Sequence, residues 1–232
     1  MSRRGRLTLF LPAALVLAGL LAWALVDLPA FGKAGGEYGV RAVDAALHQR
    51  HVANTVAGVV FDVRGVDTLG EELILFAAAI GSAVLLRAHP RAAGRRPPVS
   101  DALEALAAAL VAPVLVLGVY VIAHGHISPG GGFQGGVLVA GALLLVYAAA
   151  QRLTRPTAPA EVAEAVGALA FALVAAGGLV FASVALENFL PLGVAGDLLS
   201  GGTIPLLEVM VGVEVAGAIA LVLAELLGGG EP

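Results

Sequence analysis

The sequence has no cysteine and few charged residues, and these two shortages exclude several classes of protein. Without cysteine the chain can form no disulfide, no thiolate metal site and no cysteine-ligated iron–sulfur cluster. Charged residues make up 13% and hydrophobic residues 59% of its 232 positions, which is too apolar for an ordinary soluble domain. The composition is that of a membrane protein, and one that carries no electrons through cysteine-held centres.

Six apolar segments approach the length that a helix needs to cross a bilayer. In lipid the backbone must satisfy its own hydrogen bonds, which favours helices. We therefore predict an all-α polytopic membrane protein with about six transmembrane helices, over residues 7–26, 69–86, 101–123, 133–150, 162–186 and 204–227. The basic start and first apolar run also resemble a signal peptide, but the length of the run and the lack of a cleavage site favour a retained helix.

Basic residues are distributed unevenly between the segments that join these helices. If both termini are cytoplasmic, the inside segments hold nine of the thirteen basic residues. These nine are Arg3, Arg4, Arg6, Arg87, Arg91, Arg95, Arg96, Arg152 and Arg155. Because positive charge accumulates on the cytoplasmic side, this orientation is the one we predict.

An arginine- and proline-rich segment, residues 91–100, predicts a linker between two domains, residues 1–90 and 101–232. The first domain would hold two of the transmembrane helices and the second would hold four. In the first, residues 40–47 have the spacing of an amphipathic interfacial helix. Ser100 or Asp101 can cap the helix that follows the linker.

Residues 124–136, HGHISPGGGFQGG, interrupt two apolar runs with glycines and a proline that cannot continue a helix. Charge counting places this glycine stretch at or near the outer face, where we expect a packed, partly buried break. It could also fold back into the membrane. His124 and His126 suit proton passage near neutral pH, with solvated loop histidines as the alternative. Nothing nearby completes a metal site, and we predict neither a metal nor a cofactor.

Glu208 and Glu214 lie within the last apolar segment, where ionisable residues mark ion or proton pathways. Glu208 shares a helical face with Gly212, Ala216 and Ala220, a small-residue stripe against which another helix should pack. Glu214 lies about 120° away around the helix, so the two carboxylates should have different neighbours. The alternative is that each is a protonated side chain with a structural hydrogen bond. We expect Glu225, near the inner end, to snorkel or be solvated.

Asp67 and Glu71 lie four residues apart, on one face of a helix, and could hold a proton or a cation. A structural explanation is at least as good. Thr68 and Glu71 form a capping box that would start a helix at Leu69, and Arg64 would neutralise Asp62.

The glycine stretch resembles the signature of the MnhB/MrpB-like subunit in Mrp-type multisubunit cation/proton antiporters. The matching motif includes Pro129, Gly130, Gly131, Gly132 and Gln134. Residues 201–207 and 211–215 also match, and the resemblance covers about residues 100–228. It implies a prokaryotic cell-membrane protein that works in a hetero-oligomer with Na⁺ and H⁺, without enzyme activity or nucleic acid of its own.

Residues 61–71 are similar to the C-terminal part of the large subunit of these antiporters and to a small subunit of membrane-bound hydrogenases. The chain therefore resembles a fusion of that module with an MnhB-like one. We expect an antiporter subunit for Na⁺, or another monovalent cation, coupled to proton uptake. Two alternatives are an ion-translocating subunit of a hydrogenase or a related complex I-like redox complex, and a non-conducting structural subunit.

Overall fold

The structure is a computed structural model that describes residues 3–26, 36–88, 99–150 and 157–227. Most of the described residues are helical, and none of them lies in a β-strand. It divides into two compact units, Met1–Gly39 and Val40–Pro232. The first holds α1 (Arg3–Val26), an apolar helix with Pro12 inside it, whose Leu15 and Trp23 are exposed. The predicted all-α polytopic membrane fold is confirmed.

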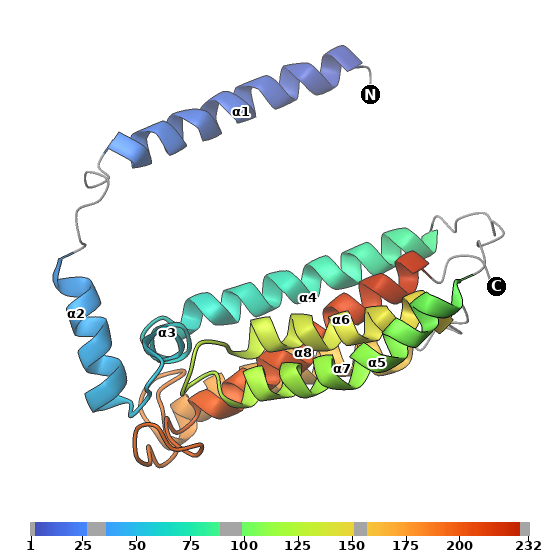
Figure 1. The fold of residues 1–232 in the computed structure, drawn as a ribbon. Helices are drawn as coiled ribbons and strands as arrows, with labels where there is room; N and C mark the ends of the chain where they lie inside the picture. Colours follow the sequence, from blue (N-terminus) through green and yellow to red (C-terminus); the bar gives the residue numbers. More distant parts are fainter. Residues whose placement is uncertain (1–2, 27–35, 89–98, 151–156, 228–232) are drawn as a thin grey trace. The chain divides into compact units, whose positions relative to one another are not determined.

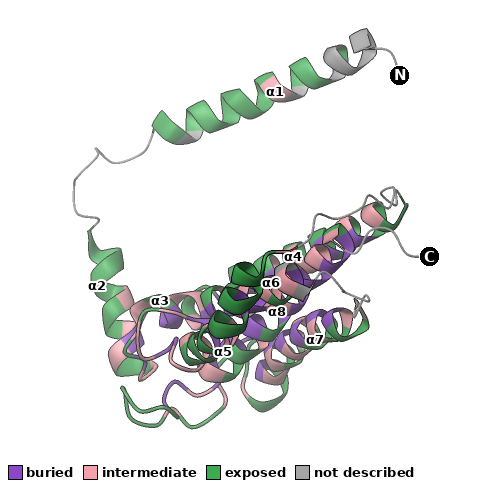
Figure 2. Cartoon of the chain, turned by 45° about the vertical axis from the view of Figure 1, so that its right-hand side comes forward, coloured by how far each residue is buried: buried purple, intermediate pink, exposed green. Residues whose placement is uncertain are grey.

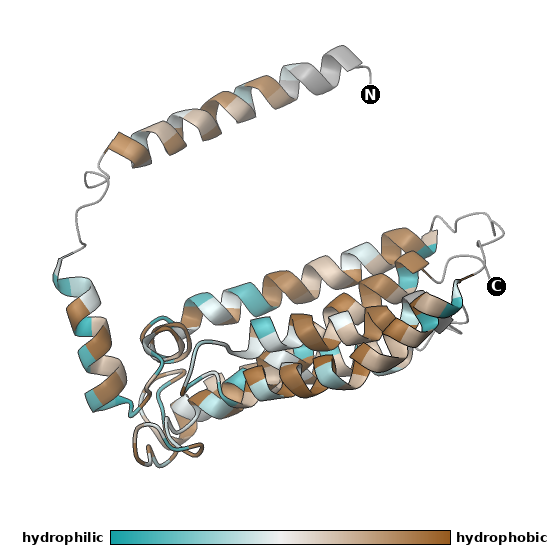
Figure 3. Cartoon of the chain, viewed as in Figure 1, coloured by the Kyte–Doolittle hydropathy of each residue, from teal (hydrophilic) through white to brown (hydrophobic). Residues whose placement is uncertain are grey.

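The second unit is a bundle of five helices, shown in Figure 1. They are α4 (Gly65–Ala88), α5 (Asp101–Ala123), α6 (Gly132–Ala150), α7 (Thr157–Phe181) and α8 (Ile204–Leu227). Four of them are long and apolar enough to cross a membrane, and α1 and α6 contain shorter apolar helices. Figure 3 shows hydrophobic residues over most of their length.

Consecutive helices of the bundle alternate in direction, as transmembrane segments with short connections must. Gly132 and Gly136 of α6 approach α8 at Val211 and Val215, so these two helices run parallel. The close approaches of α7 to α8 show that those helices run antiparallel. We call the end where α4, α6 and α8 begin the glycine end, and the opposite one the C-terminal end (Figure 1).

The central helix is α8. In its most apolar stretch 56% of the residues are buried, against 11–28% in α4, α5 and α7. Figure 2 shows buried residues along α8 and on the helix faces turned toward it. A helix enclosed by its neighbours is where polar side chains can sit away from lipid.

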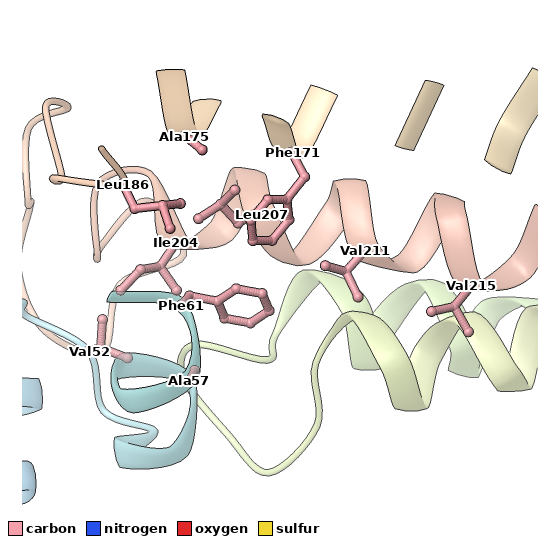
Figure 4. Packing of buried hydrophobic residues seen from close by; sticks show 10 residues of the cluster. All are labelled: Val52, Ala57, Phe61, Phe171, Ala175, Leu186, Ile204, Leu207, Val211 and Val215. Atoms are coloured by element: carbon pink, nitrogen blue, oxygen red, sulfur yellow. The ribbon is translucent and has the colours of Figure 1, made fainter. Parts of the chain in front are cut away.

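Short helical segments precede α4, and the last three pack across the glycine end. The segments are α2 (Glu37–Asp44), a π-helical turn η1 (Ala45–Gln49), α3 (Thr55–Gly58) and a second π-helical turn η2 (Val59–Val63). Phe61 packs on Phe171 of α7, with ring centroids 6.5 Å apart. This contact belongs to an apolar cluster of Val52, Ala57, Phe61, Phe171, Ala175, Leu186, Ile204, Leu207, Val211 and Val215 (Figure 4).

The predicted capping box is wrong, because η2 leads directly into α4 and the helix begins at Gly65. Thr68 lies in the second turn, where its hydroxyl donates to the Val60 carbonyl at 2.5 Å. The predicted pairing of Arg64 with Asp62 is also wrong. Arg64 bonds to Asp67, with 2.6 Å between Nε and Oδ2, while Asp62 pairs with Arg50. Arg50, the residue after η1, reaches Asp62 in η2, and Arg64 bonds forward to the first turn of α4.

Helix α7 begins earlier than the predicted start at residue 162. Thr157 starts the helix, and Pro159 lies in its first turn, where a missing N–H costs no hydrogen bond. The helix also ends earlier than predicted, at Phe181, and the positive φ of 64° at Leu186 marks the turn that follows it. At the start of α5 the predicted cap is confirmed, since Ser100 Oγ accepts from the Leu103 amide at 3.3 Å. Residues 91–98 of the predicted linker lie outside the described residues.

Candidate functional site

The glycine stretch is a packed, partly buried break between α5 and α6, as the sequence predicts. Gly125 and His126 are buried, whereas Pro129 and Gln134 are exposed. Gly130 and Gly131 have φ of 154° and 131°, a region that side-chain-bearing residues avoid. With that geometry the Gly131 amide donates back to the Val121 carbonyl of α5 at 3.2 Å.

Glycine is also required here because other atoms occupy the space of a side chain. A Cβ on Gly125 would lie 2.7 Å from the carboxyl carbon of Glu208. A Cβ on Gly132 would lie 2.6 Å from Cβ of Val211, and one on Gly136 would lie 2.8 Å from the Gly212 carbonyl. The motif therefore lets the break and α6 approach α8 closely, and it brings Glu208 against the break.

His126 and Glu208 form a fully buried pair with a defined proton inventory. Nδ1 of His126 lies 3.2 Å from Oε2 of Glu208, and Nε2 lies 3.1 Å from the Leu198 carbonyl. Because a carbonyl only accepts, Nε2 must donate. The contact with Glu208 then needs one more proton, on either the imidazole or the carboxyl group. The pair is neutral in both forms and can pass that proton between its two members.

Asn54 ties the first predicted domain to the glycine stretch. Its side-chain amide donates to the carbonyls of Gly125 at 2.6 Å and Ser128 at 3.0 Å. Its backbone amide donates to the His126 carbonyl at 3.0 Å, and its side-chain oxygen caps α3 at Val56. One half-buried residue therefore fixes the backbone on both sides of His126.

The loop before α8 supplies the other partner of His126 and is held by Asn188. The Asn188 amide donates to the Gly201 carbonyl at 2.8 Å, and its side-chain oxygen accepts from the Thr203 amide at 3.0 Å. These contacts fix the motif of residues 201–207 at the start of α8. Leu198, whose carbonyl faces His126, lies in the same loop.

A second buried acidic pair joins α4 to α8. The carboxyl groups of Glu72 and Glu214 interact, and both side chains are fully buried. None of their four oxygens has a hydrogen-bond partner among the described residues, so the two groups interact only through their charge and protonation. A Cβ on Gly167 of α7 would lie 2.6 Å from Cβ of Glu214, so α7 closes over the pair. Such a pair can share one proton or, when both groups are charged, hold a cation.

Glu164 of α7 is a third buried acidic position, with 1% of its surface exposed. Its Oε1 has no hydrogen-bond partner among the described residues. A Cβ on Gly217 would lie 2.8 Å from the Ala160 carbonyl, so the two helices pack closely at this level.

At the C-terminal end Arg87 of α4 joins Glu225 of α8 and Glu161 of α7. Its Nε lies 2.6 Å from Oε1 of Glu225, and its Nη2 donates to Oε1 of Glu161. The expectation that Glu225 snorkels or is solvated is wrong, because its side chain is 3% exposed and paired with the arginine. The two glutamates and one arginine leave one net negative charge here if all are ionised.

The structure brings together only some of the predicted site residues. Glu208 and Glu214 contact different neighbours, as expected. His126 joins Glu208, but His124 is half-buried and stacks on Tyr120, with ring centroids 4.3 Å apart. Asp67 and Glu71 lie on the exposed face of α4, where Asp67 pairs with Arg64.

Glu72, Glu164 and Asn54 were missed by the sequence prediction. For the two glutamates a signal existed, since each continues a helical stripe of small or buried residues. On α4 the stripe is Thr68, Glu72, Ala79 and Ala83, and on α7 it is Ala160, Glu164, Gly167, Phe171 and Ala175. The small-residue rule that singled out Glu208 applies to both. Nothing in the sequence points to Asn54.

Comparisons with known proteins identify a related domain and two related solved assemblies. The family model "Domain related to MnhB subunit of Na+/H+ antiporter" matches residues 102–221, more than half of the chain. An uncharacterized protein of Methanocaldococcus jannaschii, MJ1307, is 28% identical over 196 residues, covering 73% of this chain and 75% of that protein.

Two solved structures share the fold. A chain in the structure of the membrane-bound sulfane sulfur reductase, an archaeal respiratory membrane complex, has a TM-score of 0.73 and 29% identity. That match covers 96% of this chain and 98% of the other. A chain of the Mrp complex from Dietzia sp. DQ12-45-1b has a TM-score of 0.71 and 25% identity. That match covers 100% of this chain but only 27% of the Mrp chain. The resemblance to the MnhB-like subunit is confirmed, and this chain belongs to the family of proteins with a domain related to the MnhB subunit of Na⁺/H⁺ antiporters.

Proposed function

We propose that the chain is a subunit of an Mrp-type antiporter that exports Na⁺ in exchange for external protons. It is a multi-pass membrane subunit of an Mrp-like cation antiporter or a related complex. Exchange of Na⁺ in particular, a prokaryotic plasma membrane and the fusion with a module of the large antiporter subunit are parts of the proposal.

The observation that carries the proposal is the spacing of buried acidic side chains along α8. Glu208, Glu214 and Glu225 are all buried, at intervals of about 9 Å and about 16 Å at the rise of an α-helix. Glu72 of α4 lies beside Glu214, and Glu164 of α7 lies at the level of α8 between Glu214 and Glu225. A purely structural bundle has no need of acidic groups without hydrogen-bond partners in a low-dielectric interior.

The path would begin at His126 and Glu208 and continue through Glu214 with Glu72. Asp67, Glu71 and His124 are candidates for the path only where a neighbouring subunit covers them, because they are exposed or half-exposed on this chain. The glycine motif, Pro129 to Gln134, serves the path by holding the break against Glu208.

The test is Glu214→Gln in the intact complex, assayed in everted membrane vesicles by the collapse of a proton gradient on adding Na⁺. We expect antiport to be lost while the complex still assembles, since glutamine has the same shape and cannot ionise. Glu104→Gln, an exposed position in the first turn of α5, is the matched control and should retain full activity. An assembled and fully active Glu214→Gln complex would instead favour a non-conducting structural role.

A second candidate function is ion translocation within a redox complex, and one observation favours it. The chain that this protein matches nearly end to end belongs to a sulfane sulfur reductase complex, whereas the matched Mrp chain is far longer. Purification of the intact complex from its native membrane separates the two functions. Co-purification of a redox protein with metal centres contradicts the antiporter proposal.

A further inference from the structure

A cleft lies at the C-terminal end of the bundle, and the proposed path along α8 assigns it no role. It has a volume of about 290 Å³ and lies between α4, α7 and α8. Its walls are mostly apolar, and its polar lining consists of Arg87, Glu161 and Glu164. At about 30 Å³ for each water, the cleft has room for an ion that keeps part of its hydration shell.

Glu164 gives the cleft an unpartnered acceptor. The side chain is almost completely buried, lines the cleft, and its Oε1 has no hydrogen-bond partner in the described part of the chain. Glu161 lies three residues earlier on the same helix face and also lines the cleft, with its side chain half-exposed. Two carboxylates and a few waters form the oxygen-rich ligand set that hard cations prefer.

Arg87 lines the same cleft with a half-exposed side chain. Its guanidinium bonds to Glu225, which is buried and requires a positive partner, and also to Glu161, which water can solvate. The contact with Glu161 is therefore the one that a competing cation can replace at small cost. The bond to Glu225 keeps Arg87 attached when it leaves Glu161.

We infer that this cleft is a binding site for a monovalent cation, with Glu164 and Glu161 as its ligands and Arg87 as the built-in competitor. Arrival of the cation transfers Glu161 from the guanidinium to the ion. The inference rests on the proposed function, because it places the cation-loading end of the path at the C-terminal end of the bundle. The cleft adds a cation site, its ligands and a competing arginine to the path formed by the buried glutamates of α8.

The test is equilibrium binding of radioactive sodium to the purified intact complex in detergent, which needs no transport. In Glu164→Gln we expect one class of binding sites to weaken by about tenfold or more, as loss of a charged ligand implies. Glu161→Gln should weaken the same sites by less, because that side chain already shares its charge with Arg87. Glu104→Gln is the matched control and should bind sodium as the unmodified complex does.

A double variant tests the competitor without leaving a buried charge unpaired. Arg87→Gln with Glu225→Gln removes the arginine together with its buried partner and frees Glu161. We expect sodium to bind about threefold to tenfold more tightly in this variant. Equal or weaker binding would contradict the role of Arg87.

Two results separate the cleft from the wider proposal. Unchanged sodium binding in Glu164→Gln overturns the cleft site, even if the same variant loses antiport, and would make Glu164 a proton carrier instead. Conversely, a complex that binds sodium through Glu164 but exchanges no protons contradicts the antiporter proposal and leaves the cleft site intact.

Discussion

Two adjacent glutamates on α4 have opposite surroundings, and this difference is the sharpest feature at the scale of single residues. Glu71 is exposed, whereas Glu72 is fully buried against Glu214. The sequence prediction selects Glu71 because it lies four residues after Asp67 on one face of a helix, and it passes over Glu72. The stripe of Thr68, Glu72, Ala79 and Ala83 on one face of α4 indicates that Glu72 faces α8, and the packing shows that it does.

We predict that Glu72→Gln abolishes antiport and that Glu71→Gln retains most of it. The buried glutamate shares its site with Glu214, while the exposed one is solvated or meets a neighbouring protein of the complex. Both variants should assemble, since glutamine preserves shape. Everted-vesicle assays measure the outcome, and equal loss in both variants would contradict the assignment of the path to the buried face.

The His126–Glu208 pair gives a prediction about assembly as well as transport. In Glu208→Gln the new amide can donate to Nδ1 of His126, so the complex should assemble normally. In Glu208→Ala the imidazole loses its partner in a dry site, which costs about 1–3 kcal/mol and should lower the yield of complex.

Both variants should lose proton exchange, because neither glutamine nor alanine at position 208 can release a proton. Yield is measured by size-exclusion chromatography and exchange in vesicles. Normal exchange in Glu208→Gln would remove this pair from the proposed path.

Helices show a different balance between what the sequence predicts and what packing decides. The range of α8 is predicted residue for residue, because polar and glycine-rich segments bound a continuous apolar run. The start of α7 is not, because Pro159 is typical of a loop although the first turn of a helix tolerates it. That single turn moves Glu161 from a loop into the bundle.

Two glycines in α6 offer a controlled test of helix packing. A Cβ on Gly136 would lie 2.8 Å from both the Gly212 carbonyl and Cβ of Val215, whereas Gly141 has nothing within 4 Å. We therefore expect Gly136→Ala to destabilise the bundle by about 1–3 kcal/mol.

Gly141→Ala, in the same helix, should be neutral or stabilising by up to about 1 kcal/mol, because alanine favours the helix. The fraction of complex that survives heating, read by size-exclusion chromatography, compares the two. Equal stability of both variants would contradict the close approach of α6 to α8.

At the scale of the whole molecule, residues 40–88 of the first predicted domain share one packed interior with the second predicted domain. Val40–Pro232 forms a single compact unit, in which α4 packs on α7 and α8. The composition of residues 91–100 marks a junction in sequence, but composition carries no information about contacts across it. Asn54, Glu72 and Arg87 make those contacts, which a sequence read segment by segment cannot reveal.

We predict that the chain can be cut within residues 89–98 without separating its two parts. Arg87 remains paired with Glu225, and Asn54 still holds the glycine stretch, so an inserted protease site should leave the fragments associated in detergent. Co-purification after cleavage, with an affinity tag on one fragment, measures this. Separation of the fragments at low salt would contradict a shared interior.

The burial of three glutamates on α8 also has a consequence for how the protein is made. A helix with carboxylates near its centre enters a bilayer poorly alone, at a cost of about 2.5 kcal/mol or more for each central charge. Helix α8 follows α4 and α7 in the chain, so Glu72 of α4 and Gly167 of α7 are already synthesised when it emerges. Because α8 is synthesised last of the three, it can insert against polar partners in α4 and α7 instead of against lipid alone.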